Sequence, residues 1–255
     1  MPEIEFSLVL LTVLLFIVAF IYSSVGLGGG SSYTALLAIF SIHYLAIPVI
    51  SLTLNLIVSS LGTFNFIRSG HARLKLILPF LLSSIPMAYI GGSVPLPQDI
   101  FLWVLWISLF FVMIRIYFMD HIELELNLTD TSKLIISIIA GMLLGFVAGV
   151  VGIGGGIYLI PLILILGLGS AKEAAACGVI FVFVNSATGL FARTVHQPVN
   201  MLDYIPLIIA VLIGGLLGSW LGANRYSSKT IEKWLGIVVI VAIFFLGKKL
   251  ITQII

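Results

Sequence analysis

The chain has 255 residues, of which 61% are hydrophobic and 9% are charged, and its formal net charge is +2. Because a water-soluble domain carries about 25% charged residues, this composition excludes an ordinary soluble fold. It predicts an all-α, polytopic integral membrane helix bundle. The net charge gives no indication of nucleic acid as a partner, and the lone Cys177 excludes an internal disulfide.

Long apolar segments, suited to crossing the hydrocarbon core of a bilayer, recur along nearly the whole chain. In the first half we predict them at residues 6–24, 48–67, 76–92 and 100–118, with a shorter apolar segment at 31–44. A polar linker follows at 119–133. The second half has segments at 134–150, 174–192, 204–221 and 234–246, with a short one at 157–168. At 1.5 Å per residue, each short segment is either a re-entrant arm or a short, tilted crossing.

One short motif occurs twice, 126 positions apart. It reads VGLGGG at residues 25–30 and VGIGGG at residues 151–156, and each copy lies between a long segment and a short one. Glycines that open a helix let the backbone approach a ligand closely and leave N–H groups that can bind an anion. Two such sites are typical of a transporter with repeated broken helices, although glycines also serve simply to pack membrane helices closely. The predicted substrate-binding glycines are Gly26, Gly28, Gly29, Gly30, Gly152, Gly154, Gly155 and Gly156.

The repeated order of segments predicts two homologous halves, a first repeat at residues 1–118 and a second at 134–255, joined by the linker. We interpret them as inverted repeats of five segments each, with broken helices at the glycine runs and both termini outside. This arrangement places nine of the twelve Lys and Arg residues on one side, which is then the cytoplasmic side. Counting each broken helix as one crossing gives instead four segments per half, parallel repeats and an eight-to-four split.

Polar side chains inside the predicted spans are a second set of candidates, because polar groups in the hydrocarbon region usually face a cavity or the bundle interior. Ser31 and Ser32 follow the first glycine run, where they either cap a helix or face a substrate. Asn55 lies in the third segment, and Asn185 and Ser186 lie in its counterpart. Ordinary hydrogen bonding between helices is the alternative explanation for these residues.

Charged residues complete the list of candidates. Arg193 is predicted, with His196, in the loop after the segment at 174–192, and arginine can bind an oxyanion through two parallel hydrogen bonds. All ten acidic residues fall in loops or near segment ends, so we expect no carboxylate in mid-membrane. No HExxH, CxxC or Walker A motif is present. The sequence therefore predicts no metal site, no cofactor and no enzymatic activity.

These features together resemble the TauE/SafE family, also called the toluene sulfonate uptake permease family. The resemblance rests on the paired glycine runs, on Pro161 after the second run, and on a weaker match of residues 68–92 with 193–222. It implies transport of small sulfur-containing anions, such as sulfite, sulfonates or sulfoacetate, across the bacterial inner membrane. We expect Pro161 in the first turn of a helix that begins near Ile157. The first copy departs from this pattern, because Ala35 stands at the position equivalent to Pro161.

The predicted function is therefore a transporter that moves a small sulfur-containing anion by alternating access around a site between the two glycine runs. The expected partners are that anion, the lipid bilayer and, as a possibility, a second copy of the chain. Two alternatives stay open at this point. One is an anion channel with the same pore, and the other is a membrane scaffold subunit without transport.

Overall fold

The computed structural model describes residues 2–24, 28–118, 128–222 and 228–254, and within those ranges the chain is all-helical without strands. The first half contains α1 (Pro2–Ser24), α2 (Gly30–Ile39), α3 (Ala46–Arg68), α4 (Leu74–Ser93) and α5 (Gln98–Phe118). The second half contains α6 (Asp130–Val151), α7 (Gly156–Ile165), α8 (Ala171–His196), a 3₁₀ turn η1 (Leu202–Tyr204), α9 (Ile205–Gly222) and α10 (Ser228–Ile254). The predicted all-helical class is confirmed.

Each predicted apolar segment corresponds to one helix, and in both halves a long helix is followed by a short one and then by three long ones. The short helices α2 and α7 have 10 residues each, about 15 Å, which is half the thickness of the hydrocarbon core. Among the described residues, 7 helices are long and apolar enough to cross a membrane. The descent of the halves from one ancestor, and their inversion, stay predictions.

Two local predictions were wrong. Arg193 and His196 do not lie in a loop, because α8 continues to His196; the helix can continue because the Arg193 side chain finds hydrogen-bond partners inside the bundle. Pro161 is not in the first turn of α7 but is its sixth residue. Its missing N–H leaves the carbonyl of Ile157 without its usual helical partner.

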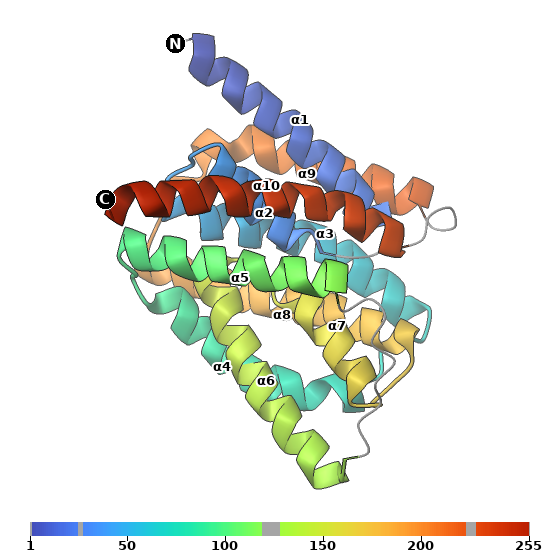
Figure 1. Ribbon diagram of the computed structural model, residues 1–255. Helices are drawn as coiled ribbons and strands as arrows, with labels where there is room; N and C mark the ends of the chain where they lie inside the picture. Colours follow the sequence, from blue (N-terminus) through green and yellow to red (C-terminus); the bar gives the residue numbers. More distant parts are fainter. Residues whose placement is uncertain (1, 25–27, 119–127, 223–227, 255) are drawn as a thin grey trace.

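The helices pack in pairs that combine the two halves: α1 lies against α9, α4 against α6, α3 against α8 and α5 against α10 (Figure 1). Glycines allow the closest of these contacts. A Cβ on Gly145 of α6 would lie 2.6 Å from the Cα of Ser84 on α4. A Cβ on Gly218 of α9 would clash with the backbone carbonyl of Phe20 on α1. Such small residues let membrane helices approach until their backbones touch.

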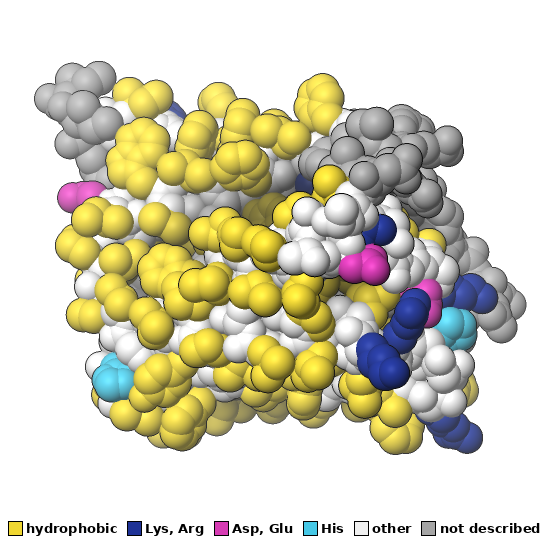
Figure 2. Space-filling view, turned by 90° about the horizontal axis from the view of Figure 1, so that it is seen from below, with side chains coloured by type: hydrophobic (Ala, Val, Ile, Leu, Met, Phe, Trp, Pro, Cys, Tyr) yellow, Lys and Arg dark blue, Asp and Glu magenta, His cyan; other side chains and the backbone are white. Residues whose placement is uncertain are grey.

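Each of the two short helices packs in its own cluster of buried apolar side chains. One surrounds α2 with residues of α1, α3, α5, α9 and α10. The other surrounds α7 with residues of α4 and α8. Outside these clusters, large apolar side chains remain exposed along the helices. Figure 2 shows them covering the middle of one face, while Lys and Arg side chains gather at one edge, as expected where a bilayer surrounds the middle of the bundle.

Candidate functional site

The two glycine runs meet inside the bundle. α2 begins at Gly30, the last residue of the first run, and α7 begins at Gly156, the last residue of the second. A Cβ on Gly30 would clash with the backbone carbonyl of Ile153, and only glycine permits this approach. Both short helices therefore start at one place, although their sequences are far apart.

The backbone of the two runs differs. Gly152, Gly154 and Gly155 have φ of +87°, +81° and +76°, a left-handed conformation that side-chain-bearing residues rarely adopt. Gly29, which caps α2, has φ −90° and is glycine for a steric reason, since a Cβ there would lie 2.6 Å from the Tyr33 ring. The second run thus needs glycine for its conformation and the first for close packing. Gly26 lies outside the described residues.

Side chains of α3 tie the runs together. Asn55 and Ser51 are both fully buried. The Asn55 Nδ2 and the Ser51 hydroxyl donate to the carbonyl of Gly152 at 3.0 Å and 2.9 Å, and the same hydroxyl lies 3.4 Å from the carbonyl of Gly30. The Gly152 carbonyl has no partner within α6, because the helix ends there in a left-handed turn, and these bonds satisfy it. They also place the Asn55 amide beside the starts of both short helices.

The side chain of Val182, on α8, contacts both runs. An added Cβ would lie 3.1 Å from it at Gly28, 2.9 Å at Gly154 and 2.6 Å at Gly156. Beside it is a cavity of about 20 Å³, enough for roughly one water molecule. Its lining comes from α1, α5, α7 and α8 and from the first run, and consists of Tyr22, Gly28, Arg115, Gly156, Ile157, Ile160, Gly178, Val179 and Val182.

Sequence reasoning predicted only Gly28 and Gly156 among these lining residues, and it missed Tyr22, Arg115 and Val182. Arg115, in the last turn of α5, counted only toward membrane orientation, but it brings a positive charge to the cavity between the runs. The Tyr22 hydroxyl lies 3.1 Å from the Ser32 hydroxyl and lines the same cavity. A tyrosine three residues before the glycine run was the one local signal available. Nothing near Arg115 or Val182 in the sequence points to the site.

Other predicted residues are buried, and some lack hydrogen-bond partners. Ser31, Asn185 and Ser186 are almost fully buried. The Asn185 Nδ2 donates to the carbonyl of Phe181 in its own helix at 2.9 Å. Among the described residues, the Oδ1 atoms of Asn55 and Asn185 and the Ser186 hydroxyl have no partner. Because a buried polar group without a partner costs about 1–3 kcal/mol, these atoms are candidates for contact with a ligand. The Ser186 hydroxyl can donate to an anion, whereas the two Oδ1 atoms are acceptors and suit a water molecule or a donor group of the ligand.

Arg193 holds the end of α6. Its side chain is 3% exposed. Nη2 donates to the carbonyl of Val150 at 2.7 Å and Nε donates to that of Gly149 at 3.2 Å, so the guanidinium caps the last turn before the second run. Its Nη1 donates to Gln197 at 3.1 Å. A cation at a helix C-terminus is favoured by the helix dipole. A direct contact of Arg193 with substrate stays a prediction.

Four acidic residues whose side chains the structure describes lie in the first turns of helices, near segment ends: Asp99, Asp130, Glu173 and Asp203. In the described part of the chain, no three His, Cys, Asp or Glu side chains form a group that could hold a metal ion. The centre of the bundle thus offers helix N-termini, hydroxyls, amide N–H groups and the guanidinium of Arg115. This set of donors suits an anion.

Comparison with known proteins agrees with this description. Residues 11–246 match the family model "Sulfite exporter TauE/SafE". The chain is 33% identical over 245 residues to "Probable membrane transporter protein y4hK" of Sinorhizobium fredii (strain NBRC 101917 / NGR234), covering 94% of this chain and 97% of that protein. It is 25% identical over 260 residues to "Probable membrane transporter protein YunE" of Bacillus subtilis (strain 168), covering 92% and 95%. No solved structure matches the chain significantly.

The match to the family model spans both glycine runs and almost all of the helices. The alignments with the two relatives also span almost the whole chain, and the names of these proteins describe membrane transporters and not enzymes. Together with the apolar helices, these matches identify the chain as a multi-pass membrane transporter that belongs to the TauE/SafE family.

Proposed function

We propose that this transporter moves a small sulfur-containing oxyanion, such as sulfite or an organosulfonate, across the bacterial inner membrane by alternating access. The proposed site lies between the two glycine runs. The observation that carries the proposal is that α2 and α7 begin at one place, with Asn55 and Val182 between the two runs. The description of the matching family, which names sulfite, supports the substrate class.

The energetics favour a site built from both runs. An anion that enters a dry site loses hydration worth several kcal/mol even after relaxation. One helix N-terminus returns about 0.3–1 kcal/mol, or ~2 in a favourable buried geometry, and each hydrogen bond to a charged group adds roughly 1.5–3 kcal/mol. One helix end with one or two N–H donors barely offsets the loss. Two helix ends, with the charge of Arg115 beside them, hold a monoanion and still release it.

In an alternating-access cycle, the small cavity corresponds to a state in which the site is closed around no substrate. A volume of about 20 Å³ is too small for a polyatomic anion, so binding requires the two runs to separate. Inverted repeats suit such a motion, because one half can rock against the other around a fixed site. In Figure 1, α5 runs from left to right and its counterpart α10 runs back from right to left, which supports the inverted arrangement.

The substrate class is tested by thermal unfolding of the purified protein with sulfite, sulfate, thiosulfate, taurine, sulfoacetate and carboxylates. A ligand that binds only the folded state stabilises it by RT ln(1 + [L]/Kd). At a ligand concentration of 100 times Kd this stabilisation is about 2.7 kcal/mol. Sulfite or a sulfonate should therefore raise the melting temperature of the protein much more than the carboxylates do. Stabilisation by carboxylates alone would exclude the proposed substrate class.

The alternatives give different results in the same preparation. An anion channel would pass ohmic currents in planar bilayers at rates far above those of a carrier. A scaffold subunit would show no stabilisation by any anion and no uptake into proteoliposomes. The proposed carrier instead gives saturable uptake of the anion that stabilises it.

We further predict that no single acidic side chain is essential for coupling to a pH gradient. Four carboxylates, those of Asp99, Asp130, Glu173 and Asp203, lie at helix starts, so pH dependence should come from protonation of the substrate or from a histidine. The histidine candidates are His71 and His196, and the Nε2 atom of His196 lies 3.2 Å from the Tyr89 hydroxyl. The measurement is pH-driven uptake by variants with one Asp or Glu replaced by its amide. If one of them binds the anion normally but loses the response to pH, the prediction is wrong.

A further inference from the structure

A basic pocket lies where α4 and α6 begin, at the opposite end of α6 from the second glycine run. It has a volume of about 220 Å³. Three cations contribute to it: Arg73 just before α4, Lys75 in the first turn of α4, and Lys133 in the first turn of α6. Its remaining lining residues are Leu76, Pro79, Asp130, Leu134, Ser137 and Leu168. Figure 2 shows a cluster of Lys and Arg side chains at the edge of an otherwise apolar face.

An apolar groove of about 430 Å³ continues from this pocket along the same two helices. Lys75, Pro79 and Leu134 line both hollows, so the pocket and the groove are contiguous. The other groove residues, Leu78, Leu82, Ser83 and Ile138, are mostly apolar. Leu82 is 66% exposed and Ile138 is 38% exposed. In a membrane protein this groove faces the acyl chains of the bilayer.

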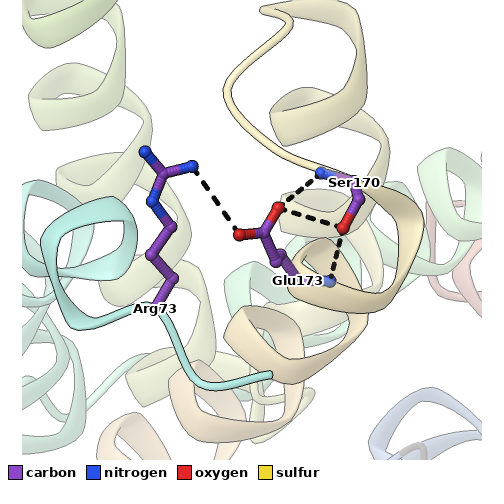
Figure 3. A network of polar contacts seen from close by, with 3 residues as sticks. All are labelled: Arg73, Ser170 and Glu173. Carbon is purple, nitrogen blue, oxygen red and sulfur yellow. Dashed lines mark hydrogen bonds and ion pairs between the residues drawn. The ribbon is translucent and has the colours of Figure 1, made fainter. Parts of the chain in front are cut away.

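The positive charge of the pocket is only partly balanced by carboxylates. Arg73 forms an ion pair with Glu173 at 3.6 Å, and Glu173 is itself held by Ser170 through bonds of 2.8 Å and 3.0 Å (Figure 3). Asp130 also lines the pocket. Within the described ranges, Lys75 and Lys133 form no ion pair, so they carry the excess charge.

We propose that the pocket and groove bind one acidic phospholipid, with its phosphate between Lys75 and Lys133 and an acyl chain along α4 and α6. Charge complementarity selects an anionic headgroup, and the adjoining groove selects a lipid over a free anion. Basic pockets between membrane helices on the cytoplasmic side are suited to acidic headgroups. The predicted orientation of the chain places this edge on that side. The bound lipid joins α4 to α6, the helix that leads to the second glycine run.

The test uses the whole protein in a neutral detergent. Phosphatidylglycerol, phosphatidylcholine with the same acyl chains, and glycerol phosphate are titrated separately, and binding is measured by native mass spectrometry. Only phosphatidylglycerol should bind tightly. Each lysine near a membrane surface contributes a factor of about 5 in affinity for acidic lipid, so the affinity of the double variant K75Q/K133Q should fall about 25-fold. The control K248Q/K249Q changes two exposed lysines that line neither hollow and should bind as the parent does.

A charge-retaining variant, K75R/K133R, keeps the test decisive if K75Q/K133Q does not fold, and it should retain tight binding. Equal binding of phosphatidylcholine would overturn the proposal, as would unchanged affinity in K75Q/K133Q. Weak binding by K75R/K133R would also overturn it. Tight binding of glycerol phosphate would show a site for a small anion and not for a lipid.

Discussion

Gly154→Val is expected to abolish anion binding and transport. Gly154 has φ +81°, where a branched side chain is strained by about 1–3 kcal/mol. Its Cβ would also lie 2.9 Å from Val182, and such overpacking costs about 1–3 kcal/mol more. Gly28→Val should have the same result through the same neighbour, since its Cβ would lie 3.1 Å from Val182. The measurement is the affinity of each correctly folded, purified variant for the stabilising anion by calorimetry.

Val182 offers a matched control for these substitutions. At Gly28 the three nearest atoms to an added Cβ all belong to Val182, so Gly28→Ala should weaken binding and the further change Val182→Ala should largely restore it. Gly154→Ala should weaken binding too, and Val182→Ala should restore it only in part, because the backbone strain at φ +81° remains. If Gly28→Val bound as tightly as the parent while Gly154→Val did not, a site shared by both runs would be excluded.

Arg193→Gln is expected to cause the largest loss of stability. The change leaves the buried carbonyls of Gly149 and Val150 without the donors that now cap α6. Each unsatisfied carbonyl costs roughly 1–3 kcal/mol, so the free energy of unfolding should fall by about 2–6 kcal/mol. Anion binding should weaken as well, because the second glycine run follows this turn directly. Unfolding in a denaturing detergent and calorimetry on the remaining folded protein measure the two effects.

The matched control is Arg68→Gln, at the exposed end of α3, which should change stability by less than about 0.5 kcal/mol. Arg193→Lys should recover only part of the loss, because an ammonium group keeps the charge but not the planar fork that contacts two carbonyls. Equal stability of Arg193→Gln and the parent would show that these hydrogen bonds do not hold the end of α6.

Much of the fold could be predicted because its signals are local. The length and hydrophobicity of a segment determine whether it crosses a bilayer, and the predicted segments all correspond to helices. Glycine marked the starts of α2 and α7 at Gly30 and Gly156, since it permits backbone geometry that other residues avoid. Charged residues in the described helices lie mostly near segment ends, because their desolvation is costly anywhere in the chain.

Only the tertiary structure decided which side chains meet. Two runs with nearly the same sequence have different backbone conformations: Gly29, which packs on Tyr33, has φ −90°, whereas the matching Gly155 has φ +76°. Arg193 belongs to α8 and not to a loop because its partners are carbonyls 43 and 44 positions earlier in the chain. Arg115 lines the central cavity because of where α5 packs. Such contacts depend on how distant helices fit together, and neither hydrophobic length nor glycine spacing encodes that fit.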